Sequence, residues 1–446
     1  MNRYFQFWKG AVSVALVVMV SLTAVQPCAA YSVLTHEEII DLAWKDNILP
    51  LLKKRFPAAT DADLKTAHAF AYGGSVMQDM GYYPFGNKYF SDLTHYVRSG
   101  DFIVSMVKEA SDLNEYAFAL GALAHYSADN CGHPAVNQAV GIEFPKLRKK
   151  YGNVVTYEDN PKDHIRTEFG FDVTQVAKNR YTSDRYHDFI GFEISKPVLE
   201  RAFQDTYGTP LSSVISNEDL AIGTFRRAIS QVIPEMTRVA LIARRKEIVS
   251  ETPNFHAREF RYYLSRTNYQ KEWGKGYQRP GFGTRVLAFF LKLVPKIGPF
   301  KALDFKIPTQ KTEDLYIASV DRTMHNYAAL LHDTAEGTLQ LTNTDFDTGH
   351  DTRAGEYALT DKTYAKLLDQ LAKNNFDQIT PGLRNNILAF YSNPGAPIAT
   401  KKKAAAWQKT EAELEKLRAM PAPASKAAWQ LPGNESNAGN SSSANF

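Results

Sequence analysis

The chain has 446 residues and a formal net charge of +4, of which Arg3 and Lys9 near the N-terminus supply two. No basic tract stands out, so the charge pattern gives no electrostatic case for a long footprint on nucleic acid, although near-neutral charge does not exclude a nuclease. The length suits one large domain or two modest ones, and an aromatic content of 12% suits a buried core.

Residues 1–30 have the pattern of a secretory signal peptide. Arg3 and Lys9 precede an almost wholly apolar run over residues 11–25, and Cys28 and Ala30 place small residues at positions −3 and −1. A permanent membrane anchor is the alternative, but the run is shorter than the ~20 residues that a spanning helix needs. We expect cleavage after Ala30 and export to the periplasm or the medium. Cys131 is then left without a disulfide partner in its own chain.

Helical periodicity dominates the rest of the chain, and strand signals are few. Residues 35–38 have the pattern of a capped helix start. Further helical segments are predicted over residues 112–129, 216–249, 312–339, 361–374 and 401–420, the first of them apolar enough to be buried. The sequence therefore predicts an all-α fold.

Composition divides the mature chain into four parts. We expect an N-terminal domain over residues 31–250, a connection rich in Gly and Pro over 251–285, a helical C-terminal extension over 286–420 and a disordered tail over 421–446. Within the extension, residues 286–300 form an apolar stretch that includes Lys292 and Lys296 and could lie on a membrane surface. An ordinary core helix followed by a Pro-Gly loop is the alternative.

Two pairs of His and carboxylate residues have the spacing of metal ligands on a helix. His125 and Asp129 are four residues apart, as are His164 and Glu168, so each pair projects from one helix face. Such spacing lets one helix present two ligands to a metal ion. A single pair of this kind is often a surface salt bridge. A charged Asp on a buried face, however, costs several kcal/mol unless it is paired or bound to metal.

Four more side chains are candidate ligands: His36, Asp79, His95 and His133. Each alone could equally be a helix cap or a hydrogen-bonding group. His133 lies between Gly132 and Pro134, at a predicted helix end. The neighbouring Cys131 is more typical of a small buried hydrophobic residue than of a ligand.

Taken in order, these residues resemble a known ligand set. The series Tyr31, His36, Asp79, His95, His125-x3-Asp129, His133 and His164-x3-Glu168 is similar to that of the zinc-dependent phospholipase C family, which is related to the fungal single-strand-specific zinc nucleases. The resemblance covers about residues 31–250 and implies an all-helical catalytic domain that binds up to three zinc ions.

The resemblance also implies how the ligands divide among the ions. The first zinc would be bound by Asp79, His95, His125 and Asp129. The second would be bound by His36, a bridging Asp129 and the amine and carbonyl of Tyr31, and the third by His133, His164 and Glu168. The α-amine of Tyr31 becomes free only after signal cleavage, which would link export to activation.

The sequence departs from the family pattern in two places. The family usually begins its mature chain with Trp, whereas this chain would begin with Tyr31; ligation by backbone atoms should tolerate the change. His133 follows Asp129 by four residues, whereas better-known members have a wider gap, so a local loop rearrangement would be needed to bring His133 to the third zinc. A lysine-rich segment over residues 146–150 is expected as an insertion at the rim of the site.

Clustered zinc ions favour hydrolysis of phosphodiesters, with Asp79 orienting or deprotonating the attacking water. Cleavage of phospholipid headgroups is the first prediction, because His-x3-Glu168 and residues 286–300 suit the phospholipase branch. A single-strand nuclease is the alternative, for which Tyr82, Tyr83 or Phe85 could stack on bases. A third possibility is a non-catalytic exported protein stabilised by zinc. Nothing in the sequence sets the oligomeric state.

Overall fold

The computed structural model describes residues 32–177, 191–233 and 305–421, with a few isolated residues between 236 and 247. The predicted signal peptide, Tyr31, the connection over 251–285, the apolar stretch over 286–300 and all of the predicted tail after Pro421 lie outside the described residues. Among the helices that are described, none is long and apolar enough to cross a bilayer.

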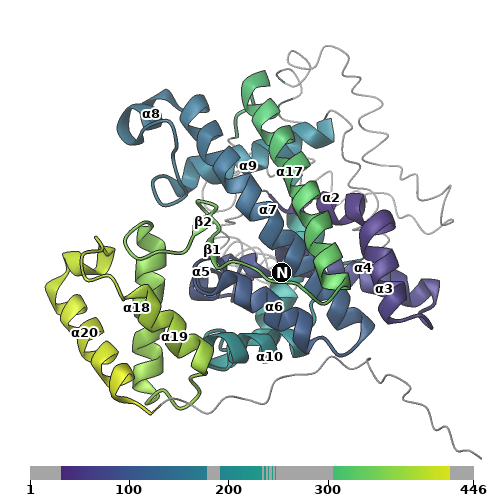
Figure 1. Ribbon diagram of the computed structural model, residues 1–446. Coiled ribbons are helices and arrows are strands. Elements are labelled where there is room, and N and C mark those ends of the chain that lie inside the picture. The colour runs from purple at the N-terminus through teal and green to yellow at the C-terminus, as the bar shows by residue number, and fades with distance from the viewer. Residues whose placement is uncertain are drawn as a thin grey trace, which may run out of the picture.

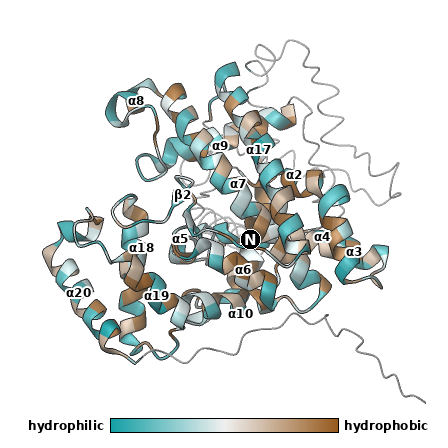
Figure 2. Cartoon of the chain, in the orientation of Figure 1, coloured by the Kyte–Doolittle hydropathy of each residue, from teal (hydrophilic) through white to brown (hydrophobic). Residues whose placement is uncertain are grey.

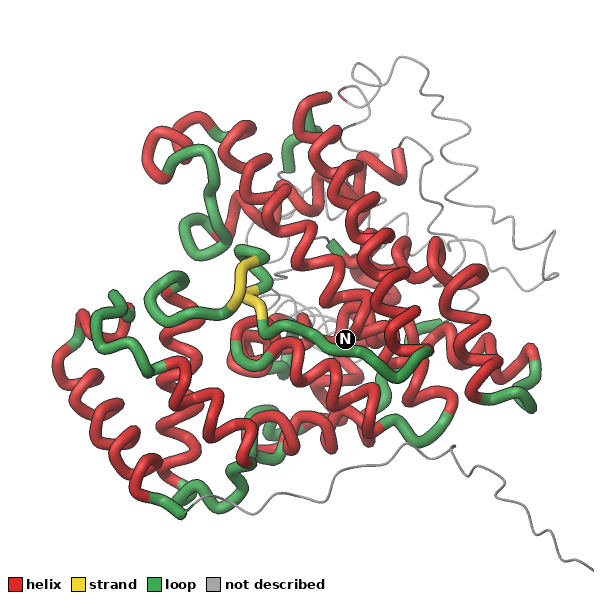
Figure 3. The backbone as a smooth tube through the Cα atoms, viewed as in Figure 1, coloured by secondary structure: helices red, strands yellow, loops and turns green. Residues whose placement is uncertain are grey.

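The described chain is predominantly helical, with one short hairpin as its strand content, which confirms the predicted all-α class (Figures 1 and 3). The α-helices of the region before residue 234 are α2 (Val33–Ala43), α3 (Leu49–Arg55), α4 (Asp61–Val76), α5 (Lys88–Tyr96), α6 (Ser99–Glu109), α7 (Leu113–Glu143), α8 (Pro145–Tyr151), α9 (Pro161–Ala177), α10 (Lys196–Tyr207) and α11 (Glu218–Arg227). Shorter helical turns are Trp44–Ile48, Met77–Tyr82, Leu211–Ser213 and Ala228–Val232.

The region after residue 304 adds four helices and one small hairpin to the described fold. The helices are α17 (Gln310–Ala335), α18 (Ala358–Lys373), α19 (Pro381–Phe390) and α20 (Ala404–Ala419), the last preceded by the turn Ala399–Lys402. Strands β1 (Thr344–Asp345) and β2 (His350–Asp351) pair antiparallel, with Thr344 opposite Asp351. Hydrophobic and hydrophilic residues alternate along α18 and α20 (Figure 2), as expected of helices with one buried face.

Helix α7 lies at the centre of the fold, between α4 and α17 (Figure 1). Small residues allow α4 and α7 to approach to backbone contact. A Cβ atom added to Gly121 of α7 would lie 2.1 Å from the carbonyl oxygen of Ala71, and one added to Gly74 of α4 would lie 2.0 Å from that of Phe118. The close approach sets the distance between the two helices and so the place of every polar side chain on α7.

We therefore expect Gly121→Ala to lower the free energy of unfolding by about 1–3 kcal/mol, the usual cost of overpacking a core. Gly223→Ala is the matched control, since a Cβ atom there meets nothing within 4 Å on helix α11. A helical Gly→Ala change without steric conflict should stabilise by about 0.5–1 kcal/mol. Urea denaturation measures whether each variant has a lower or higher free energy of unfolding than wild type. An unchanged midpoint for Gly121→Ala would contradict the backbone contact.

The region after residue 304 packs on the earlier helices and shares their hydrophobic core. Helix α17 lies along α7, where the hydroxyl of Tyr327 donates to the carbonyl of Leu120 at 2.8 Å. Its Tyr316 hydroxyl lies 2.7 Å from Thr35 Oγ1 on α2. Helix α18 packs beside α5. The C-terminal region is thus in direct contact with the elements that hold the candidate ligands.

The predicted helix end near His133 is wrong. Helix α7 continues through Pro134 to Glu143. Proline removes one backbone donor and usually breaks a helix at a cost of ~3 kcal/mol, but both flanks of Pro134 are buried against other elements, with Cys131, His133, Ala135 and Val136 all in the interior. Tertiary packing therefore outweighs the local signal. The lysine-rich segment forms α8, in which no residue is buried.

Candidate metal centre

Five elements place polar side chains in one buried cluster inside the helical fold. Helix α2 supplies His36, the turn Met77–Tyr82 supplies Asp79, and α5 supplies His95. The remaining members come from α7 and α9, and are His125, Asp129, His133, His164 and Glu168. Each of the eight side chains is exposed by 2% or less. Buried imidazoles and carboxylates in this number require partners or a cation.

The continuous helix α7 explains how its three residues reach the cluster. His125, Asp129 and His133 follow one another at intervals of four, so a single face of α7 presents all three. No loop rearrangement is needed to bring His133 to the cluster, which corrects the prediction made from its spacing. The Nε2 atom of His133 lies 3.6 Å from Asp129 Oδ2.

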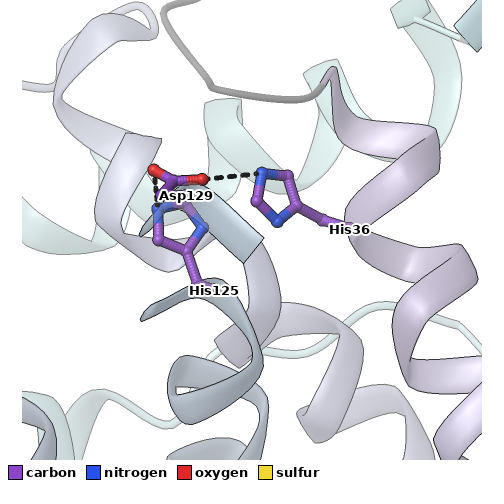
Figure 4. Close-up of side chains that lie close together, drawn as sticks. All are labelled: His36, His125 and Asp129. Atoms are coloured by element: carbon purple, nitrogen blue, oxygen red, sulfur yellow. Dashed lines mark ion pairs between the residues drawn. The ribbon is translucent and has the colours of Figure 1, made fainter. Parts of the chain in front are cut away.

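Asp129 lies between the imidazoles. Its Oδ2 atom is 3.0 Å from Nε2 of His125, and its Oδ1 atom is 3.5 Å from Nε2 of His36 (Figure 4). The His36 and His125 rings stack with their centroids 4.5 Å apart. One ligand atom from each of these three residues lies within 4.8 Å of the others, the arrangement expected around a single ion.

Two further groups of three residues also have their ligand atoms within 4.8 Å of one another. The Nε2 atom of His95 lies 3.4 Å from Asp79 Oδ1 and 3.5 Å from Asp129 Oδ2, and Asp79, His95 and His125 form the second group. In the third, Nε2 of His164 lies 2.8 Å from Glu168 Oε1 and 3.2 Å from Nδ1 of His133. The structure thus brings together all eight predicted side chains. Asp129 belongs to the first group and also contacts His95 of the second and His133 of the third.

Backbone carbonyls orient two of the imidazoles. Nδ1 of His95 donates to the carbonyl of Ser91 at 2.8 Å, and Nδ1 of His125 donates to that of Ser75 at 2.9 Å. A proton held on Nδ1 leaves the Nε2 lone pair directed at the cluster, which is the usual second hydrogen bond of a metal-bound histidine. Ser75 belongs to α4, so the close packing of α4 on α7 also sets the His125 ring.

His125–Asp129 and His164–Glu168 lie at hydrogen-bond distance, but several other separations within the cluster fit zinc better than they fit hydrogen bonds. Two ligands at ~2.0–2.1 Å from a tetrahedral ion are roughly 3.3–3.4 Å apart, whereas nitrogen–oxygen hydrogen bonds are ~2.7–3.2 Å long. The separations of 3.4–3.6 Å that His95 and His133 make with carboxylates match the former. Within the described residues, both carboxylate oxygens of Asp79 and Asp129 lack hydrogen-bond donors. The donor set and its geometry therefore fit zinc.

The electrostatics of the cluster also favour a cation. Burial disfavours the charged form of His95, but the carboxylates of Asp129 and Asp79 outweigh burial and raise its pKa to about 10. The carboxylates thus favour a positive charge at this point, and a bound cation would take the place of the proton on Nε2. Burial raises the pKa of Asp79, whereas His125 and its neighbours outweigh burial at Asp129 and hold its pKa well below the usual range. Burial and the nearby His125 lower the pKa of His36 to about 3, so this imidazole is neutral, as a ligand must be.

Residues 35–217 match the sequence model of the family described as zinc dependent phospholipase C. The match covers less than half of the chain and shows that this region is similar to the zinc-dependent phospholipase C family. The matched span contains all eight clustered side chains, and the match confirms the resemblance noted in the sequence. No curated protein and no solved structure matches the chain. Similarity to this family supports a zinc-dependent hydrolase of the phosphodiesterase type.

Two buried carboxylates that lie beside the cluster, Asp172 and Asp347, were not identified from the sequence. Asp172 follows Glu168 by four residues on α9, and its carboxylate accepts from the Leu34 amide at 3.0 Å and from Thr35 Oγ1 at 2.6 Å. Burial raises its pKa to about 6. Asp172 thereby fixes the start of α2 beside His36, and its four-residue spacing from Glu168 could have revealed it. Asp347 contacts His133 from the C-terminal region, and no sequence signal points to it.

Two of the aromatic residues considered for base stacking are buried. Tyr82 and Tyr83 are exposed by 5% and 3%, and the Tyr83 ring packs edge-on against Phe225. Phe85 is 57% exposed. Tyr82 and Tyr83 therefore serve as core residues and offer no stacking surface to a nucleic acid.

Proposed function

We propose that this chain is an exported phosphodiester hydrolase that binds up to three zinc ions and cleaves phospholipid headgroups in the manner of a phospholipase C. The observation that supports this most is the convergence of three buried groups of imidazole and carboxylate ligands around Asp129. The signal pattern of residues 1–30 supports export to the periplasm or the medium.

The ligands divide among the ions as the family pattern implies. Asp79, His95, His125 and Asp129 would hold the first zinc, and His36 with a bridging Asp129 would share the second with the backbone of Tyr31. His133, His164 and Glu168 would hold the third. Zinc at these positions would supply Lewis acidity, which lowers the pKa of a bound water and offsets charge on the phosphate.

The chain's own residues would then set up the attack. Asp79 lies next to both His95 and His125, in position to orient the attacking water and accept its proton. Ser91 and Ser75 hold two imidazoles in the ligating tautomer through their carbonyls. Asp172 fixes the start of α2 beside His36. Ligands that are already oriented by hydrogen bonds need little reorganisation as the substrate phosphate binds.

Phospholipid is a better substrate than nucleic acid for two reasons. A single-strand nuclease needs exposed aromatic rings on which bases stack, and Tyr82 and Tyr83 are buried. The chain also has no basic tract to follow a polynucleotide backbone. The apolar residues 286–300, with Lys292 and Lys296, would provide peripheral contact with the bilayer.

The test is hydrolysis by the purified mature chain of phosphatidylcholine vesicles and, separately, of a single-stranded oligonucleotide. We expect release of phosphocholine that a chelator abolishes and added zinc restores. Cleavage of the oligonucleotide without headgroup release would instead establish the related nuclease activity. Hydrolysis of neither substrate by a chain with its zinc bound would establish a non-catalytic zinc protein and overturn the proposal.

A further inference from the structure

The hairpin region over residues 342–351 lies directly on the candidate metal centre, although it is about 130 residues beyond the family match. In Figure 1 strands β1 and β2 lie beside α5. Ser99 Oγ of α6 donates to the carbonyl of Thr344 at 2.6 Å and accepts from its amide at 3.0 Å. The Tyr126 hydroxyl of α7 donates to the carbonyl of Thr342 at 2.9 Å. These bonds fix the hairpin region to the helices that hold the ligands.

The turn of the hairpin is shaped to approach α7 closely. Gly349 has a φ of +71°, and a Cβ atom there would lie 2.8 Å from the carbonyl oxygen of Asn130 and 3.0 Å from Pro134 Cγ. Pro134 lacks the amide that would bond to Asn130 in a regular helix. The proline inside α7 thus coincides with the docking point of the turn, one residue from His133.

Phe346 covers two imidazoles of the centre. Its amide donates to the carbonyl of His95 at 3.2 Å, and its ring is fully buried. The ring centroid lies 5.3 Å from that of His95 and 6.1 Å from that of His125. An apolar side chain at this point excludes water and lowers the local dielectric, which strengthens charge interactions within the centre.

Asp347, the next residue, turns its carboxylate into the same interior and is also fully buried. Its Oδ2 atom accepts hydrogen bonds from the hydroxyls of Tyr96 at 2.9 Å and Tyr357 at 2.5 Å. Its carbonyl accepts from Asn137 Nδ2 of α7 at 2.7 Å. The carboxylate is therefore held in one orientation from three elements.

The second carboxylate oxygen of Asp347, Oδ1, faces His133 instead of a hydrogen-bond donor. Oδ1 of Asp347 accepts no hydrogen bond from the described residues and lies 3.4 Å from Nε2 of His133. That separation is the one expected of two ligands of a tetrahedral zinc, roughly 3.3–3.4 Å. The two tyrosines then correspond to the outer hydrogen bonds that metal-bound carboxylates generally receive.

We propose that Asp347 is a zinc ligand, supplied by the C-terminal region, whose Oδ1 atom binds an ion at Nε2 of His133. The other ring nitrogen of His133, Nδ1, faces His164 of the third group. This inference rests on the proposed zinc centre. It gives a reason for the short interval from Asp129 to His133, because a His one turn further along α7 points Nε2 at Asp347. It also gives the C-terminal region a direct part in the centre.

The test compares Asp347→Asn with Asp345→Asn, purified in zinc and dialysed against zinc-free buffer. Asn keeps the size of Asp347 and an acceptor for the tyrosines but loses the charged ligand. Asp345 is the matched control, a buried carboxylate of the same hairpin that binds Thr360 Oγ1 at 2.6 Å instead of an imidazole. We expect Asp347→Asn to lose one zinc per chain relative to wild type and Asp345→Asn to lose none.

Zinc titration and thermal unfolding, with and without zinc, separate this result from misfolding. Replacing an outer hydrogen-bonding residue weakens metal binding by about 10–100-fold, so loss of a true ligand should weaken it by more than about 100-fold. The rise in melting temperature on zinc addition should shrink in Asp347→Asn while the metal-free melting temperature stays near that of wild type. A smaller loss of affinity overturns ligation by Asp347 yet leaves the zinc centre intact, whereas absence of zinc from wild type overturns the centre itself.

Discussion

Replacing Asp129 by Asn is expected to abolish hydrolysis and remove more than one zinc per chain. Asp129 contacts His36, His95, His125 and His133, at distances from 3.0 to 3.6 Å, so it is shared by several ligand groups. Activity should fall by more than about 10³-fold, because even an outer residue that only orients a ligand is worth about 10–100-fold in metal affinity or activity. Elemental analysis and phosphocholine release on the same preparation measure both effects.

Glu115→Gln is the matched control for Asp129→Asn. Glu115 is a buried carboxylate of the same helix α7, but it pairs with Arg201 at 2.7 Å and with the Ser111 amide at 2.8 Å. Its loss should lower stability without lowering the zinc content. Equal zinc loss in both variants would mean that damage to α7, and not the shared ligand, explains the result, and would contradict the account.

Asp79→Asn is expected to lower kcat more than it lowers substrate binding. The carboxylate lies 3.4 Å from Nε2 of His95 and belongs to the same ligand group as His125. Loss of the proton acceptor alone should reduce kcat by about 10²–10⁴-fold with KM changed little. Loss of the first zinc, which Asp79 would also hold, should lower kcat further. Zinc bound through His164 and Glu168 should remain, since Asp79 is not part of that group.

Asp92→Asn provides the comparison for Asp79→Asn. Asp92 lies on α5 near His95, but its carboxylate pairs with Lys88. We expect the kcat of the Asp92→Asn enzyme to stay within about threefold of wild type, because Asp92 belongs to none of the three ligand groups and pairs with a half-exposed lysine. Steady-state kinetics on a soluble short-chain phosphatidylcholine measure kcat and KM separately. An Asp79→Asn enzyme with kcat within tenfold of wild type would remove Asp79 from the mechanism.

Much of the metal centre could be predicted because helix geometry fixes which residues share a face. The four-residue spacing of His125 and Asp129, and of His164 and Glu168, needed no tertiary information. The same rule extended one turn further would have placed His133 and Asp172 correctly. Pro134 hid this continuity at His133, since proline is the strongest local signal of a helix end and only the packing around α7 overrides it.

The contribution of Asp347 could not be predicted from the sequence. More than 170 residues separate it from Glu168, and it lies in a hairpin whose strands have two residues each. Its position depends on tertiary contacts with α5, α6 and α7, which no local pattern encodes. One of three Asp residues in a Gly- and Thr-containing segment looks like any turn residue. Tertiary contacts of this kind can be identified only from the folded structure.

The measurement that tests the central claim most directly is the zinc content of the purified mature chain, with Tyr31 verified as its first residue. Elemental mass spectrometry should give close to three zinc ions per chain, and the number should fall in Asp129→Asn. A chain that holds essentially no zinc after purification in excess zinc would contradict the account, because the buried cluster around Asp129 would then be a hydrogen-bonded core and not a catalytic centre.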